Sequence, residues 1–162
     1  MVLELLSRNH DIVCLVHPSS KSKTLLGLPV QIITGDVLNV SSFESYLSSC
    51  EYVVHIAAST SVWPGRNELV NRINIEGTRN VMTASQRARI KRFIHVGSAN
   101  SFDPGTLENL GTEANGYTGW KYKNDYLDSK YKTQLMLLGE FKKNKFPVII
   151  ISPTFMLGPY DS

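Results

Sequence analysis

The apolar residues of this sequence fall into short runs separated by longer polar or periodic stretches. Each run is four to seven residues long, rich in Val and Ile, and bounded by polar or turn-forming residues. Runs of this kind are typical of parallel strands that are buried on both faces. The sequence therefore predicts five strands, at residues 12–16, 30–34, 52–58, 93–96 and 147–151.

The stretches between these runs have the spacing of helices. Apolar residues recur every three to four positions over 68–88 and 124–143, which indicates two long amphipathic helices. Shorter helices are expected at 1–7 and after Ser41 or Ser42, either of which can act as the cap. Strands that alternate with helices predict an α/β fold, a doubly wound parallel sheet that binds ligands at the carboxyl ends of its strands.

The helix expected over 124–143 opens with a tyrosine and a lysine four positions apart, Tyr126 and Lys130. Residues at this spacing share one helix face, so a phenol and an ammonium can point into the same cleft. The ammonium favours the phenolate form of a side chain whose ordinary pKa is about 10, which makes the phenol a usable proton shuttle. A solvated surface pair is the structural alternative.

A second copy of this spacing, Tyr117 and Lys121, lies among turn-forming residues that disfavour a helix. The first copy instead opens an apolar stripe at helical spacing, made of Leu127, Tyr131, Leu135 and Leu138. Only the first copy is therefore expected to stand on a helix.

Composition and charge exclude several classes of function. The 162 residues are 42% hydrophobic and 19% charged, as in one globular domain or part of one. The net charge is +3 and the basic residues are spread along the chain, so nothing indicates a nucleic-acid surface. No apolar run is long enough to cross a bilayer, and the four histidines show no ligand-like spacing. We expect a cytoplasmic protein without a membrane span or a metal site.

Six short motifs connect the sequence to a known family. They are Gly35-Asp36-Val37, Val54-His55-Ile56-Ala57-Ala58, Asn74-Ile75-Glu76-Gly77-Thr78, Phe93-Ile94-His95-Val96-Gly97-Ser98-Ala99, Tyr126-x-x-Ser129-Lys130 and Pro153-Thr154-Phe155-Met156-Leu157-Gly158-Pro159. In this order and at these separations the motifs resemble the extended short-chain dehydrogenase/reductase family, which includes NAD-dependent epimerases, dehydratases and dihydroflavonol-reductase-like enzymes. The resemblance covers essentially the whole chain and implies a Rossmann-like fold.

The resemblance implies roles for three residues at the reaction centre. Tyr126 would pass a proton to or from the substrate oxygen while hydride moves to or from a nicotinamide. Lys130 would stabilise the phenolate and bind the nicotinamide ribose, and Ser98 would orient the substrate oxygen. The structural alternative for Ser98 is a hydroxyl that caps the turn after its strand.

The resemblance also implies a set of residues that line the dinucleotide, namely Asp36, Val37, Ala57, Ala58, Asn74, Lys130 and Pro153. Asp36 would accept a hydrogen bond from the adenine, and Pro153 would lie by the nicotinamide carboxamide. The structural alternatives are an ordinary turn at Asp36 and a tether to a neighbouring segment at Asn74.

The choice between NADP and NAD depends on the end of the second family strand. Enzymes that select NAD usually place an acidic residue there, whereas this sequence has His17, Ser19, Ser20 and Lys21. These side chains suit a 2′-phosphate, so we favour NADP over NAD.

Two parts of the family pattern are absent. The Gly-rich turn and its strand, which bind the pyrophosphate, do not occur before 12–16, and the segment that builds most of the substrate pocket should follow Gly158. We therefore expect 1–162 to be a partial NAD(P)-binding Rossmann-like domain with no substrate domain. The sheet should have a gap between 12–16 and 52–58, and the chain alone should neither bind a dinucleotide tightly nor turn over.

The leading hypothesis is an NAD(P)-dependent oxidoreductase that acts on a small-molecule carbonyl or secondary alcohol. The alternatives are a nucleotide-sugar epimerase or dehydratase that uses the same groups, and a non-catalytic binding protein that keeps the fold. A dehydratase needs an extra acid near Ser98, for which Asp103 and Glu108 are candidates. Relatives often pair through their long helices, which implies a homodimer formed by 68–88 and 124–143.

Overall fold

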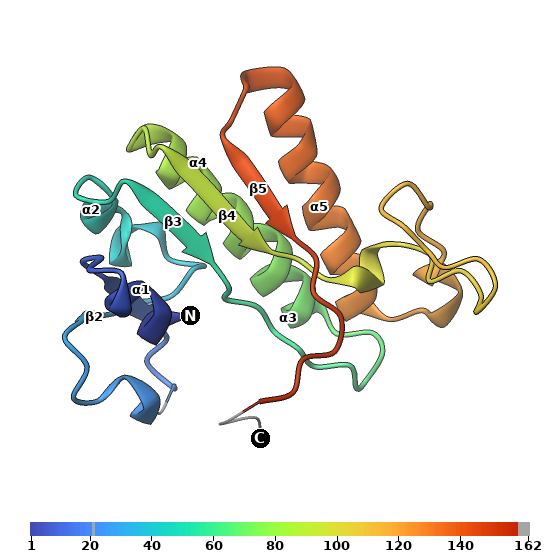
Figure 1. The fold of residues 1–162 in the computed structure, drawn as a ribbon, viewed down its shortest axis with the longest axis horizontal. Helices are drawn as coiled ribbons and strands as arrows, with labels where there is room; N and C mark the ends of the chain where they lie inside the picture. The colour runs from blue at the N-terminus through green and yellow to red at the C-terminus, as the bar shows by residue number, and fades with distance from the viewer. Residues whose placement is uncertain (21, 159–162) are drawn as a thin grey trace.

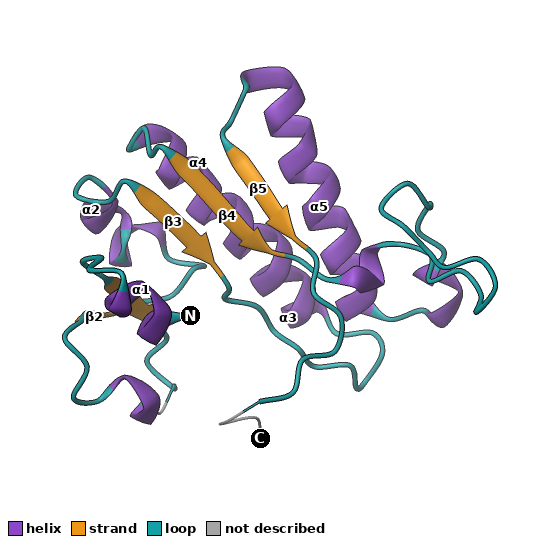
Figure 2. Cartoon of the chain, viewed as in Figure 1, coloured by secondary structure: helices purple, strands orange, loops and turns teal. Residues whose placement is uncertain are grey.

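The computed structural model describes residues 1–20 and 22–158, and these form an α/β arrangement of parallel strands and helices (Figures 1 and 2). The helices are α1 (Val2–Ser7), α2 (Glu44–Leu47), α3 (Glu68–Asn71), α4 (Thr78–Arg87) and α5 (Asp125–Asn144). The strands are β1 (Val13–Val16), β2 (Gln31–Thr34), β3 (Tyr52–His55), β4 (Arg92–Val96) and β5 (Val148–Ile151). All five predicted strands and the alternation with helices are confirmed.

The strands form two parallel sheets. β1 pairs with β2, with Leu15 opposite Ile33, and β3, β4 and β5 pair in that order, with His55 opposite His95. In the described part of the chain no strand lies between β1 and β3, so each has one unpaired edge. The predicted gap is therefore present, and the incomplete Rossmann-like class is confirmed.

Helices α3, α4 and α5 lie together on one face of the three-stranded sheet (Figure 1). In the core beneath them, Phe93 of β4 and Leu137 of α5 have exposed fractions of 0%. The same core extends to the two-stranded sheet through Ile33. On the opposite face of β5, Ile149 and Ile151 are 45% and 51% exposed.

A π-helical stretch, Arg72–Gly77, joins α3 to α4 in one continuous helical segment. Such stretches are rare and often occur at functional sites. A Cβ atom on Gly77 would lie 2.7 Å from Cγ2 of Val37, so only glycine allows this close approach of the helix to the segment after β2. The structural role predicted for Gly77 is confirmed.

Two local predictions are wrong. β3 ends at His55 instead of continuing to Ala58, because its pairing with β4 stops there. The helix after β2 begins at Glu44, and no serine caps it. The hydroxyl of Ser42 accepts a hydrogen bond from the Asp36 N–H (3.0 Å) and thereby closes the turn after β2.

The helix predicted from the stripe Leu127, Tyr131, Leu135 and Leu138 is present as α5, but the stripe is not its buried face. Leu135 and Leu138 are 49% and 38% exposed, whereas Lys130, Thr133 and Leu137 are buried. The periodicity located the helix correctly and left its orientation undetermined.

Candidate functional site

The first two turns of α5 carry Tyr126 and Lys130, and Lys130 reaches the carboxyl end of β4. Oδ1 of Asn124 caps the helix by accepting from the N–H groups of Tyr126 (3.0 Å) and Leu127 (3.2 Å). Nζ of Lys130 donates to the carbonyl of Val96 (3.3 Å) and lies 6.0 Å from the centre of the Tyr126 ring. The structure therefore brings the phenol and the ammonium together on one helix face.

Lys130 is unusually enclosed for a lysine, with an exposed fraction of 6%. Burial lowers the pKa of Lys130, because desolvation disfavours the charged form. Among the described residues only the Val96 carbonyl accepts a hydrogen bond from its Nζ, although an ammonium has three N–H donors. A ligand with hydroxyl oxygens, such as a ribose, would satisfy the remaining donors.

Asn74 ties the loop after β3 to α5. Its Oδ1 accepts from the Ser59 N–H (2.7 Å), and its Nδ2 donates to the Ser59 carbonyl (3.1 Å) and to Oγ of Ser129 (2.9 Å). With an exposed fraction of 2%, Asn74 is enclosed within this set of contacts. Asn74 thus tethers the loop after β3 to α5, and its predicted role at the cofactor stays a prediction.

Ser98 and Pro153 lie where β4 and β5 end. Oγ of Ser98 accepts from the Asn100 N–H (3.2 Å), so this hydroxyl caps the short 3₁₀ helix that follows. The hydroxyl proton of Ser98 remains available to a ligand. The carbonyl of Pro153 accepts from the Ala99 N–H (2.9 Å), which holds the two strand ends together.

The residues expected to bind the adenosine half lie after β2 and β3. Oδ1 of Asp36 accepts from the Leu38 N–H (2.9 Å), an ordinary turn, and its Oδ2 lies 3.8 Å from Nε2 of His17. Val37 is buried against Gly77 and so is part of the packing. After β3, Ala57 is exposed and Ala58 half-buried. The predicted 2′-phosphate residue Lys21 lies outside the described residues.

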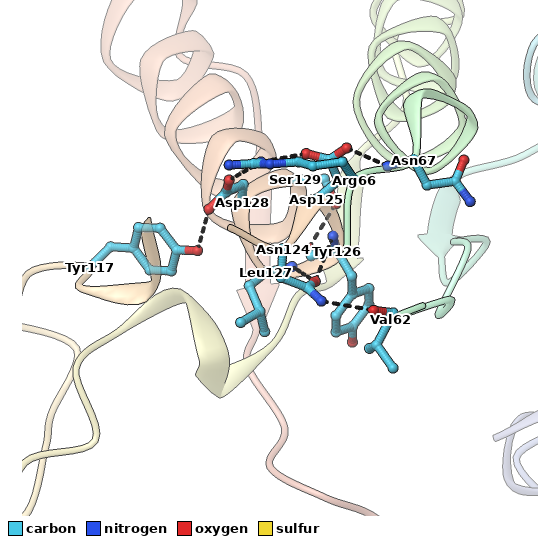
Figure 3. Close-up of polar contacts among 10 residues, drawn as sticks. All are labelled: Val62, Arg66, Asn67, Tyr117, Asn124, Asp125, Tyr126, Leu127, Asp128 and Ser129. Atoms are coloured by element: carbon cyan, nitrogen blue, oxygen red, sulfur yellow. Dashed lines mark hydrogen bonds and ion pairs between the residues drawn. The ribbon is translucent and has the colours of Figure 1, made fainter. Parts of the chain in front are cut away.

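Nothing in the sequence points to the charged cluster that adjoins Tyr126 (Figure 3). Nη1 of Arg66 bridges Oδ1 of Asp125 (2.7 Å) and Oδ2 of Asp128 (2.9 Å). Oδ2 of Asp125 also accepts from the Asn67 N–H (2.7 Å). Arg66 precedes these two aspartates by 59 and 62 positions, a separation at which no local spacing rule applies.

Tyr117 belongs to the same cluster. Its hydroxyl donates to Oδ1 of Asp128 (2.7 Å), and its ring stacks on Tyr131 with centroids 4.4 Å apart. Burial and the hydrogen bond to Asp128 raise the pKa of Tyr117, which keeps the phenol protonated as a donor. The second Tyr-x-x-x-Lys copy therefore contributes a structural tyrosine.

The charge on Asp125 is also fixed by this cluster. Burial raises the pKa of Asp125, but the hydrogen bonds from Arg66 and from the Asn67 N–H outweigh burial and hold the pKa below its ordinary value. The first turn of α5 is thus anchored by an ionised carboxylate.

Two stacked histidines lie on the inner face of the sheet. His55 of β3 and His95 of β4 have ring centroids 5.5 Å apart, and Nε2 of His55 is 2.9 Å from Oγ1 of Thr78. Burial, followed by the charge of Lys130, lowers the pKa of His55 to about 4. Burial, the neighbouring His55 and Lys130 lower the pKa of His95 to about 3. Both rings are neutral at physiological pH.

A cavity of about 830 Å³ adjoins Leu127 and is walled by the loop between β4 and α5 together with Ser152 and Thr154. A cavity of this size can hold a small organic molecule. Asp103 in this wall accepts from Oγ1 of Thr118 (2.6 Å) and from the Gly105 N–H (2.9 Å), and these bonds lower the pKa of Asp103.

Within residues 1–20 and 22–158, no three or more His, Cys, Asp or Glu side chains are grouped so that they could hold a metal ion. Over the same ranges, no helix has the length and apolar character needed to cross a membrane.

Comparison with known proteins supplies the context for this geometry. The model of the NAD dependent epimerase/dehydratase family matches residues 1–162. A relative from Synechocystis described as a putative dihydroflavonol 4-reductase is 26% identical over 99% of this chain and 46% of its own length. The crystal structure of gox2253 superposes with a TM-score of 0.89 at 25% identity, over 98% of this chain and 48% of that one.

A third similar protein is the UDP-glucose 4-epimerase of Thermus thermophilus, whose structure was determined in complex with NAD. It has a TM-score of 0.77 and 16% identity, over 93% of this chain and 49% of that one. The chain thus spans about half the length of the curated relatives it matches, 46% and 48% for the first two.

Proposed function

Because this chain belongs to the NAD-dependent epimerase/dehydratase family, we propose that it is the proton-transfer part of an NAD(P)-dependent oxidoreductase acting on a carbonyl or a secondary alcohol. The observation that carries this proposal is the enclosed ammonium of Lys130, 6.0 Å from the Tyr126 ring at the carboxyl end of β4. No other tyrosine and lysine in the described chain share an α-helical face next to a strand end.

The residues present fit the nicotinamide half of a dinucleotide. Lys130 has unused N–H donors for ribose hydroxyls, and the Ser98 hydroxyl proton is free for a substrate oxygen. The described residues contain no Gly-rich turn to hold a pyrophosphate, so we assign none of them to it.

A bound nicotinamide would supply or accept hydride at the substrate carbon. In the direction of reduction, Tyr126 would donate its phenolic proton to the carbonyl oxygen as hydride arrives, which gives the alcohol. Lys130 would stabilise the phenolate left behind until a proton from solvent restores the phenol. Ser98 would hold the substrate oxygen in line. The cavity beside Leu127 would admit the substrate.

The test is a Tyr126→Phe substitution in a protein that contains this chain and is as long as its relatives. We expect the rate of nicotinamide-coupled carbonyl reduction to fall by roughly 10²- to 10⁴-fold while nucleotide binding is retained. Tyr52→Phe is a matched control, because Tyr52 is 53% exposed and begins β3, at the opposite end of the strand from the site. Normal activity of the Tyr126→Phe variant would refute the proposal.

A nucleotide-sugar epimerase or dehydratase is the second candidate, supported by the likeness to the Thermus thermophilus epimerase. For a dehydratase Asp103 is less favourable, because the hydrogen bond from Thr118 lowers its pKa and keeps the carboxyl ionised, so that it has no proton to give as a general acid. A tightly held nucleotide with no net change in oxidation state would favour the epimerase. A protein that binds a partner but no nucleotide would favour the non-catalytic alternative.

Three finer points belong to the same proposal. We favour NADP over NAD because His17 and Ser19 occupy the position expected near a 2′-phosphate, although Asp36 lies beside His17. A homodimer through the long helices is supported by the exposed Leu135 and Leu138 of α5. The third point is that we propose a cytoplasmic location for the protein.

A further inference from the structure

The charged cluster beside Tyr126 takes no part in the proposed proton transfer, but Arg66 binds the first turn of α5, the helix that carries Tyr126. We infer that Arg66, Asp128 and Tyr117 are positioning residues that set the place of Tyr126 in the cleft and join α5 to the wall of the substrate cavity. The functional meaning of this inference rests on the proposed role of Tyr126.

The first step is the link between α5 and the loop after β3. Arg66 bridges two carboxylates on the first turn of α5, and the Asp125 N–H donates to the Gly65 carbonyl (2.7 Å). Nδ2 of Asn124 donates to the Val62 carbonyl (3.0 Å). Charge-assisted hydrogen bonds are short and directional, so the turn cannot rotate or slide without losing several of them.

The second step is the link to the cavity wall. Asp128 is 2% exposed, and its two oxygens are divided between Arg66 on one side and the Tyr117 hydroxyl on the other. Tyr117 leads directly into the segment that contains Thr118 and Gly119, both of which line the cavity. One buried carboxylate therefore holds the helix and the wall in a fixed relation.

The third step is the direction of Tyr126. Its ring points away from the carboxylates of Asp125 and Asp128 (Figure 3). The cluster thus binds the first turn of α5 on the side opposite to the Tyr126 ring. It can act on the phenol only by fixing the position of the backbone. A buried carboxylate left with one unmet oxygen would favour another arrangement of the turn.

Hydrogen exchange at the backbone amides of Tyr126 and Leu127 tests this inference directly in the free chain. Tyr117→Phe removes one hydroxyl, keeps the charge and keeps the ring that stacks on Tyr131. Arg66→Ala removes the bridge. We expect both variants to exchange these two amides about tenfold faster or more, with a much smaller change near Leu137, because opening is confined to the first turn.

A matched control is Arg87→Ala, which removes an exposed arginine paired with Glu44 at 3.7 Å and should leave the exchange of α5 unchanged. In the active full-length protein, Tyr117→Phe should lower kcat and shift the pH profile while the KM for nucleotide is unchanged. Unchanged exchange in Tyr117→Phe, or an equal rise along the whole of α5, would overturn the inference. If Arg66→Ala does not fold, Tyr117→Phe alone decides.

The two tests fail separately. Should Tyr126→Phe retain activity while Tyr117→Phe still loosens the first turn, the proposed function is wrong and the mechanical link stands. Should Tyr126→Phe abolish activity while the exchange is unchanged, the function stands and the positioning inference is wrong.

Discussion

The segments around Tyr126 and those around Asp36 lie at strand ends of the same fold but are held to very different degrees. The first is fixed by the Asn124 cap, the Asn74 tether and the buried Asp128. Around Asp36 the contacts are local turn bonds with Leu38 and Ser42 and a 3.8 Å approach to His17, none of them fully buried. The side that we propose for proton transfer is therefore held by more buried contacts than the side that we propose for the nucleotide.

The two sides differ because side-chain hydrogen bonds hold one of them, whereas the other depends on strand pairing. The Tyr126 side is held by side-chain bonds that α5 makes to loops and to β4, all within the described chain. At the other side, β1 and β3 each present an unpaired edge, and the ladder hydrogen bonds of a strand edge come only from a neighbouring strand. Side-chain networks can thus be complete where a sheet is not.

Among the changes considered, acid should cause the largest loss of unfolding free energy, through two buried histidines close to Lys130. His55 and His95 have pKa values lowered to about 4 and about 3, so the unfolded chain binds protons that the folded chain refuses. Their contribution to stability is therefore full above the unfolded value of 6.5 and falls as the pH drops below it. By about pH 5 the loss is about 2 kcal/mol for each histidine, or ~4 kcal/mol together.

Urea unfolding at several pH values measures this loss. His95→Leu should remove about half of the acid dependence, because one of the two histidines with a lowered pKa is then absent. An acid dependence of full size in the His95→Leu variant would contradict the assignment.

Truncation of an apolar side chain should cost more unfolding free energy on the Tyr126 side than on the Asp36 side. Leu137→Ala removes a leucine with an exposed fraction of 0% and should cost about 3 kcal/mol of unfolding free energy. Ile32→Ala, in β2 at 41% exposure, should cost at most about 1 kcal/mol. Chemical denaturation measures both, and equal losses would show that the two sides are equally well packed.

A pair of asparagines gives a smaller contrast. Asn74→Ala removes three hydrogen bonds and leaves Ser59 and Ser129 with unmet groups, so we expect a loss of about 2 kcal/mol. Asn80→Ala removes one bond to the Val37 carbonyl and should cost about 1 kcal/mol or less. Thermal unfolding would show a larger drop in Tm for Asn74→Ala, and the reverse order would contradict the tether.

Much of the fold and part of the site could be predicted from the sequence. The five apolar runs specify strands because strands buried on both faces need continuous hydrophobicity, and the spacing of Tyr126 and Lys130 specifies a shared helix face. The pairing of Arg66 with Asp128 could not be predicted, because nothing local relates residues so far apart. The buried face of α5 was also hidden, since polar Thr133 and Lys130 lie inward while Leu135 lies outward.

The signal that Asn124 is the cap was present in the sequence, because an Asn followed by Asp at the start of an apolar-periodic stretch is a common helix start. The alternatives for Asn74 and Ser98 could not be separated by residue type, since an amide or a hydroxyl serves a ligand or a turn equally well. The structure shows the partners of these groups within the fold, Ser129 for Asn74 and the Asn100 N–H for Ser98, and their roles toward a ligand stay predictions.

The central claim is that the side proposed for proton transfer is firmly held, whereas the described residues on the side proposed for the nucleotide include no pyrophosphate site. Titration of the free chain with NADPH and with NADH, followed by the fluorescence of Trp63 and Trp120, tests it most directly. We predict no saturation below about 1 mM of either nucleotide, because no described residues hold the pyrophosphate. Saturation in the low micromolar range would contradict the claim and would require another element of this chain to bind it.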